Sequence, residues 1–289
     1  MSAPGGSAYS AAFFDTQAAG SLASARVVLA ALLGRVPVQS VVDVGCGVGP
    51  WLRAALELGA SRVLGLDGAY VDRDRLLIDP ARFLACDLAV DSLTEAVSGH
   101  GPGFDLVVSV EVAEHLPPSR APSFVAQLCA LGDLVLFSAA VPGQGGTGHV
   151  NEQWPAYWAQ LFDKAGCTCF DVLRPLLWDE PGCEWWYLQN VLMFARRATP
   201  AWERLSRFRP PAAGPPPALV HPRMYEHATT FFSEHVRELK ELREQVVYFR
   251  ELAAAHANTI EVIRASTAWR VTGPIRGLAA RLRSADRST

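Results

Sequence analysis

Residues 41–51, Val-Val-Asp-Val-Gly-Cys-Gly-Val-Gly-Pro-Trp, are the stretch that decides the fold of this chain. The three valines of its first half are β-branched and apolar, as in a fully buried parallel strand. Three glycines at alternate positions, starting at Gly45, then permit backbone torsions and close approaches that a Cβ would block. Their G-x-G-x-G spacing differs from the G-x-G-x-x-G of a dinucleotide-binding turn. The stretch predicts a strand, a tight turn and a helix with room for a ligand at its N-terminus; a tight turn that binds nothing is the alternative.

Short apolar segments of the same kind recur further along the chain, at residues 62–67, 83–88, 104–110 and 133–138. The first of them ends in Asp67, and the second contains Asp87. An acid at the end of the second strand of such a fold can accept hydrogen bonds from ribose hydroxyls. These segments predict four more strands, and the acids predict a nucleoside-binding edge.

Helical patterns separate the predicted strands, at residues 22–34, 51–58, 91–99, 119–131 and 154–166. Strand–helix–strand connections of this length imply parallel pairing with right-handed crossovers. After the last of these helices, residues 167–173 and 186–196 are predicted to form two strands joined by a loop.

In this order, the segments resemble the class I S-adenosylmethionine-dependent methyltransferases over about residues 20–198. The resemblance implies an α/β fold with a doubly wound, seven-stranded, mostly parallel sheet, whose seventh strand runs antiparallel beside the fifth. It also implies that the glycine turn packs against the methionine part of the cofactor, that Asp67 holds the ribose, and that Asp87 and Leu88 flank the adenine. The cofactor-binding residues expected from it are Asp43, Gly45, Cys46, Gly47, Gly49, Asp67, Gly68, Asp87 and Leu88.

The composition narrows the class of protein. The 289 residues are 50% hydrophobic and carry a formal net charge of −3, so a large core is available and there is no basic field for nucleic acid. The six cysteines form no C-x-x-C pair, which argues against a structural zinc site and favours a reducing compartment. The sequence shows neither a signal peptide nor a membrane-spanning run, and we expect a cytoplasmic protein.

The composition changes near residue 200, and we expect three parts: a methyltransferase domain (1–198), a proline-rich linker (199–230) and a coiled-coil helix with its tail (231–289). The prolines gather at residues 209–217 and predict an extended segment. Apolar side chains beyond the linker follow the 3-4 spacing of a coiled-coil seam, with one polar member, at Leu239, Leu242, Val246, Phe249, Ala253, His256, Ile260 and Ile263. Such a helix needs a partner, either a second copy or another enzyme; a helix folded back on its own domain is the alternative.

Two loops after the fourth and fifth strands carry the candidate catalytic groups. Glu111, Glu114 and His115 form E-x-x-E-H after the fourth strand, and His149 lies in the loop after the fifth. Either histidine is a candidate general base, and Glu111 is a third candidate catalytic residue. The same four side chains resemble the metal site of the small-RNA and ubiquinone-pathway O-methyltransferases, which implies Mg²⁺ or Mn²⁺. A metal-free histidine base and purely structural roles are the alternatives.

The acceptor is indicated only indirectly. Trp185 and Trp186 are candidates for a pocket wall, because aromatic rings stack on sugar faces. Residues 265–276 resemble a short segment found at the ends of bacterial glycosyltransferases and glycan-modifying enzymes. We therefore expect an O-methyltransferase acting on a hydroxyl of a sugar, polysaccharide or glycosylated small molecule. Methylation of a polyketide, phenol or carboxylate, or a non-catalytic scaffold, are the alternatives.

Overall fold

The computed structural model describes residues 11–208 and 214–276. Residues 1–10, the first part of the proline stretch (209–213) and the end of the tail (277–289) lie outside the described residues. The chain divides into two units, residues 1–228 and 229–289. The three-part division at 198 and 230 stays a prediction.

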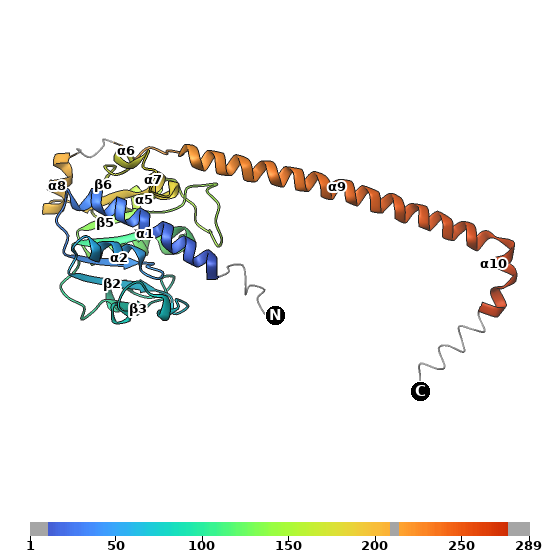
Figure 1. Ribbon diagram of the computed structural model, residues 1–289, viewed down its shortest axis with the longest axis horizontal. Coiled ribbons are helices and arrows are strands. Elements are labelled where there is room, and N and C mark those ends of the chain that lie inside the picture. The colour runs from blue at the N-terminus through green and yellow to red at the C-terminus, as the bar shows by residue number, and fades with distance from the viewer. Residues whose placement is uncertain (1–10, 209–213, 277–289) are drawn as a thin grey trace, which may run out of the picture. The chain divides into compact units, whose positions relative to one another are not determined.

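The first unit is built on seven strands, which Figure 1 shows between helices: β1 (Ser40–Val44), β2 (Arg62–Asp67), β3 (Phe83–Ala85), β4 (Leu106–Val110), β5 (Leu134–Ser138), β6 (Cys167–Phe170) and β7 (Leu192–Arg196). They form one sheet in the order β3-β2-β1-β4-β5-β7-β6. The first five pair in parallel, and β7 runs antiparallel to both β5 and β6. The expected doubly wound, mostly parallel sheet is confirmed, including its antiparallel seventh strand.

The described part of the first unit contains the five expected helices, the first of which starts at residue 11 rather than 22, and three helices that were not expected. They are α1 (Ala11–Leu33), α2 (Pro50–Glu57), α3 (Leu93–Ala96), α4 (Ala121–Leu131), α5 (Pro155–Lys164), α6 (Arg174–Leu177), α7 (Trp185–Asn190) and α8 (Pro200–Phe208). Single 3₁₀ turns lie at Arg73–Arg75, Pro80–Arg82, Ala113–His115 and Pro118–Arg120.

Side chains of alternate strand residues enter two separate apolar clusters, one on each face of the sheet. Val41 packs in the cluster that holds Leu29 of α1 and Leu52 of α2. Its neighbour Val42 packs in the other cluster, with Phe124 of α4. Burial on both faces explains why the strands are near-continuous apolar runs rather than alternating ones.

Several strands are shorter than predicted, and the largest difference lies at β7. Residues 186–196 were expected to be extended, but α7 occupies Trp185–Asn190 and only Leu192–Arg196 form β7. The ladder between β7 and β5 begins at the pair of Leu192 with Phe137, one residue before β5 ends. Residues before 191 therefore have no strand to pair with, and they satisfy their backbone groups in a helix instead.

A 44-residue helix, α9 (Pro222–Ala265), begins in the first unit and continues through the second, where α10 (Thr267–Val271) follows it. In the first unit, the segment before α9 is fixed by the buried guanidinium of Arg174, which donates to the carbonyl oxygen of Pro217 at 3.1 Å. The backbone N–H of His221 donates to Gln189 Oε1 at 2.8 Å. In the described part of the chain, no helix combines the length and the hydropathy that a membrane crossing requires.

Candidate active site

The glycine turn follows β1 and leads into α2. Gly45, Gly47 and Gly49 have φ values of 87°, 53° and 86°, a left-handed region that side-chain-bearing residues rarely adopt. A Cβ on Gly45 would collide with the side chain of Val112, whereas no atom lies within 4 Å of the position that a Cβ on Gly47 would take. The turn thus packs tightly at its first glycine and leaves open space beside its second.

Asp43 is buried at the end of β1, with 1% of its surface exposed, and its Oδ2 atom has no hydrogen-bond partner. Burial raises the pKa of this carboxyl well above its usual range, and the nearby charge of Asp67 adds to the rise. A buried carboxylate that lacks a partner is costly in a free protein. It is the kind of group that a polar ligand can satisfy.

Asp67, at the end of β2, is held by three donors. Its Oδ2 accepts the backbone N–H of Gly47 at 2.7 Å, and its Oδ1 accepts the N–H of Gly68 at 2.6 Å and the hydroxyl of Tyr70 at 2.5 Å. Tyr70 itself is 84% exposed. The acid therefore ties the glycine turn to β2, and one of its oxygens is covered by a surface side chain.

The remaining expected cofactor residues lie around this turn. Cys46 is buried beneath it, and Leu88 is buried after β3. Asp87 is exposed, and its Oδ1 accepts the N–H of Ala89 at 3.0 Å. The structure thus places every expected cofactor residue at or just beyond the ends of β1, β2 and β3.

These residues fit S-adenosylmethionine. The position beside Gly47 is open next to the start of α2, and the Oδ2 atom of Asp43, near the end of the preceding strand, lacks a hydrogen-bond partner. Asp67 offers a carboxylate to ribose hydroxyls, since Tyr70 is exposed and free to leave it.

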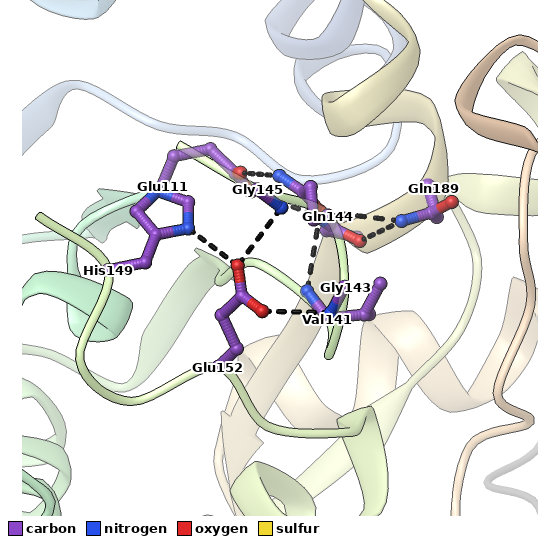
Figure 2. A network of polar contacts seen from close by, with 9 residues as sticks. Glu111, Val141, Gly143, Gln144, Gly145, His149, Glu152 and Gln189 are labelled. Atoms are coloured by element: carbon purple, nitrogen blue, oxygen red, sulfur yellow. Dashed lines mark hydrogen bonds and ion pairs between the residues drawn. The ribbon is translucent and has the colours of Figure 1, made fainter. Parts of the chain in front are cut away.

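Glu111 follows β4 and has an unusual backbone for a residue with a side chain, with φ at 54°. Its Oε1 accepts from Ser138 Oγ at 2.8 Å and from Asn190 Nδ2 at 3.1 Å, and its Oε2 accepts from Gln144 Nε2 at 2.8 Å. Figure 2 shows the link from Glu111 through Gln144 to Gln189. Burial raises the pKa of Glu111, and the hydrogen bonds oppose that rise. The carboxylate is thus fixed by a hydroxyl from β5 and by side-chain amides from the loop after β5 and from α7.

A second acid lies one turn further on. Glu114 is fully buried, and neither of its carboxylate oxygens has a hydrogen-bond partner. One ligand atom each of Glu114, His115 and His149 lies within 4.8 Å of the other two. Burial, and next the charge of Glu111, raise the pKa of Glu114 well above its usual range. The structure brings these three expected ligands together, and among the described residues Glu111 is not part of the group.

The two histidines contact each other through their rings, whose centroids are 4.8 Å apart in an edge-to-face arrangement. His115 is exposed on the 3₁₀ turn after β4. Partial burial, and then the neighbouring His149, lower the pKa of His115. His115 therefore stays neutral, and able to accept a proton or bind a cation, at a lower pH than an ordinary histidine.

The carboxylate of Glu152 holds the imidazole of His149 through its Nδ1 atom. The Nδ1 atom of His149 lies 2.9 Å from Glu152 Oε1, and the same carboxylate accepts the backbone N–H groups of Gly143 and Gly145 (Figure 2). Burial would raise the pKa of Glu152, but the hydrogen bonds from His149 and Gly143 outweigh it and the pKa is lowered. A carboxylate on Nδ1 fixes the orientation of the ring and leaves Nε2 for chemistry.

Several polar residues of this site escaped the sequence analysis. Ser138, Gln189 and Asn190 carry no motif; Ser138 and Asn190 bond Glu111, and Gln189 bonds Asn190, only because β5 and α7 come together. Tyr70 also gave no signal beyond its place after β2. Gln144 and Glu152 lie in a loop that the sequence had marked as chemically rich, although their roles there were not foreseen.

Comparison with known proteins gives the family. The model of a family described as "methyltransferase domain" matches residues 14–190, which is more than half of the chain. No curated protein matches the sequence significantly.

Among solved structures, this chain is similar to magnesium protoporphyrin IX methyltransferase from Synechocystis PCC 6803 with bound SAH, at 19% identity and a TM-score of 0.46 over 66% of this chain and 90% of that one. DesVI from Streptomyces venezuelae matches at 14% identity and 0.47, over 64% and 95%. SAM-bound CalS10 from Micromonospora echinaspora, an amino pentose methyltransferase, matches at 16% identity and 0.46, over 67% and 100%. On the strength of the family match, this chain belongs to the methyltransferase-domain family and is an S-adenosylmethionine-dependent methyltransferase.

Proposed function

We propose that this enzyme methylates a hydroxyl group of a sugar, polysaccharide or glycosylated small molecule. The observation that carries the proposal is the pair of His149 and Glu152, in which the carboxylate holds Nδ1 at 2.9 Å. S-adenosylmethionine supplies an electrophilic methyl group, and a hydroxyl must lose its proton to accept it. A histidine oriented by a carboxylate is a suitable group to take that proton.

The position of the pair supports this role. His115 and His149 follow β4 and β5, whereas the expected cofactor residues follow β1, β2 and β3. In open α/β sheets, ligands bind beyond the carboxyl ends of the strands, so both sets of residues border one crevice. The histidines would then serve the acceptor rather than the cofactor.

A divalent cation is a second version of the same chemistry, and a specific observation favours it. The carboxylate of Glu114 is buried without a partner, beside the ring nitrogens of His115 and His149. Mg²⁺ or Mn²⁺ accepts such a mixed set of oxygen and nitrogen ligands, and Glu152 would then orient His149 as a ligand. When bound, the ion would lower the pKa of an acceptor hydroxyl. Glu111 would support the site without being a ligand.

The sugar class of the acceptor has weaker support. Trp154 is 40% exposed two residues after Glu152, and Trp185 and Trp186 are half-buried on α7. Exposed faces of aromatic rings suit the apolar faces of sugar rings. The tail at residues 265–276 adds its resemblance to segments of glycan-modifying enzymes.

The test is methyl transfer by the full-length enzyme, with isotopically labelled cofactor and two panels of acceptors, read by mass shift. One panel holds saccharides and glycosylated small molecules, and the other holds phenols, polyketides and carboxylates. We expect labelled product only in the first panel. Product only in the second panel would replace the acceptor class, and tight S-adenosylhomocysteine binding without any turnover would favour a scaffold.

The same assay decides between the two versions of the chemistry. If the cation is needed, EDTA abolishes the rate, Mn²⁺ or Mg²⁺ restores it, and Glu114→Gln behaves like the EDTA-treated enzyme. If the histidine acts alone, EDTA has no effect and His149→Ala loses about 10²–10⁴-fold in kcat. Full activity of the double variant His115→Ala/His149→Ala would defeat both versions.

The C-terminal part of the chain is proposed to be a coiled-coil module that joins the enzyme to a second copy or to a partner enzyme. Its support is the seam of apolar side chains, from Leu239 to Ile263, on one continuous helix.

A further inference from the structure

The second unit presents a stripe of apolar side chains on a long helix. Within α9, Leu239, Phe249 and Ile260 expose 56%, 62% and 49% of their surfaces. Figure 1 draws α9 as one uninterrupted helix, so the 3-4 spacing of these positions stays in phase along it. An exposed stripe of this kind on a helix that builds no core of its own marks an interaction surface.

The spacing assigns each residue a place in a heptad written abcdefg. The a positions are Leu239, Val246, Ala253 and Ile260, and the d positions are Leu242, Phe249, His256 and Ile263. Two of the four a residues are β-branched, and β-branched a residues favour two strands in parallel coiled coils when leucine is at d, as it is at Leu242. His256 is the one polar member of the seam, and a polar residue in a seam helps to fix the register of the two strands.

The charged residues on either side of the seam indicate which partner helix can pair with α9. The residues just before each a position, called g, are Glu238, Gln245, Leu252 and Thr259, and those just after each d position, called e, are Arg243, Arg250, Ala257 and Arg264. In a parallel, in-register pair, a g residue of one helix faces the e residue five positions later in the other. Glu238 then faces Arg243 of a second copy, twice by symmetry, and Gln245 faces Arg250.

The antiparallel arrangement lacks these contacts. There, e residues face e residues and g residues face g residues. Arg243, Arg250 and Arg264 would meet only one another or the uncharged e residues, and Glu238 would find no cation. Like charges that face each other across an interface weaken it.

We infer that α9 pairs with α9 of a second copy of this chain as a parallel, in-register, two-stranded coiled coil over residues 239–263. This deepens the coiled-coil part of the proposed function and rests on it, while the methyltransferase chemistry does not enter. A second copy supplies Arg243 opposite Glu238 and Glu238 opposite Arg243 at the same time, because both residues lie on the same helix.

The first experiment exchanges charges in the full-length protein and measures the dimer dissociation constant by sedimentation equilibrium. Each single variant, Glu238→Arg or Arg243→Glu, replaces two attractions by two repulsions and should weaken the dimer about 10-fold. The double variant Glu238→Arg/Arg243→Glu should recover most of that loss. A monomeric parent at all concentrations would overturn both the coiled-coil module and this inference. A dimer that is indifferent to both single variants would overturn the inference alone.

The second experiment tests the register by disulfide cross-linking under mild oxidation. Leu242→Cys places two thiols opposite each other at d only when the helices are parallel and in register, and it should give a cross-linked dimer that a reductant separates. Glu244→Cys, at an f position on the far side of the helix, is the matched control and should stay uncross-linked. Efficient cross-linking of the control but not of Leu242→Cys would contradict the proposed interface. An enzyme with intact turnover in these variants shows that the first unit is undisturbed.

Discussion

The Nδ1 atom of His149 and the Oε1 atom of Glu152 lie 2.9 Å apart, and the carboxylate that holds the imidazole is itself held by two backbone N–H groups. Gly143 and Gly145 supply those donors from the same loop, at 2.8 and 3.1 Å. The loop therefore orients the histidine through one acid. The position of His149 relative to Glu114 and His115 depends on Glu152, even though Glu152 need not touch the acceptor.

Glu152→Gln should lower kcat about 10- to 100-fold and leave S-adenosylhomocysteine affinity unchanged. The amide has only one acceptor oxygen for three donors, so it cannot hold the imidazole and both glycines, and loss of such a supporting partner typically has this cost. Steady-state kinetics and calorimetric titration give the two quantities. Glu95→Gln, an exposed acid on α3, is the control and should match the parent. A weakened cofactor affinity with normal kcat would move Glu152 out of the acceptor side of the site.

Tyr70→Phe should bind S-adenosylhomocysteine about 2- to 10-fold more tightly. In the free enzyme the phenol donates to Asp67 Oδ1 at 2.5 Å, and a ribose hydroxyl that needs the same oxygen must displace it. Calorimetric titration measures the change, with the exposed Tyr248→Phe of α9 as the unaffected control. Weaker binding in Tyr70→Phe would mean that the phenol itself contacts the cofactor. Asp67→Ala, in contrast, should lose about 1–3 kcal/mol of binding free energy.

Asp43→Asn should stabilise the free enzyme at pH 8, by about 1–3 kcal/mol, and give no gain at pH 4. Burial raises the pKa of Asp43 in the folded state well above its unfolded value, so the folded state holds the proton more tightly. The contribution of this group to the free energy of unfolding is therefore present at low pH and lost as pH rises through the folded pKa. Asparagine has no charge to lose, so its advantage grows with pH.

Urea unfolding at the two pH values measures the difference. Asp74→Asn, an exposed acid, should be neutral at both. A larger stabilisation by Asp43→Asn at pH 4 than at pH 8 would show that the carboxyl is ionised and satisfied in the folded state. The variant should also bind S-adenosylhomocysteine more weakly if Asp43 belongs to the cofactor site.

Gln189→Leu should destabilise the protein by about 1–3 kcal/mol, because it leaves buried polar groups without partners. Gln189 is fully buried, its Oε1 accepts the N–H of His221, and its Nε2 donates to Asn190 Oδ1 at 3.0 Å. Asn190 in turn donates to Glu111, so kcat should fall as well. Urea unfolding and steady-state kinetics report the two effects. Gln160→Leu, on the exposed side of α5, should change the stability by less than about 0.5 kcal/mol.

Local patterns were enough for the order of the elements. The glycine turn after β1 was predictable from the sequence, because a backbone in the left-handed region, as at Gly45, strongly favours glycine. Strands buried on both faces are also recognisable in the sequence, because they are near-continuous apolar runs, as the valines of β1 show. The exact length of β7 could not be found, because it depends on where its partner β5 ends.

The sequence by itself determined the fold family, the order of the strands and the acids at their ends. Each of these depends on the backbone preferences and the burial of a few neighbouring residues. The long C-terminal helix also followed from its own spacing, and its coiled-coil pairing stays a prediction. Only the tertiary structure decided that Glu111 turns to Ser138, Gln144 and Asn190, while Glu114 joins the two histidines. The physical reason is that buried polar groups take their partners from whichever elements the folded sheet brings beside them, and those lie far apart in the chain.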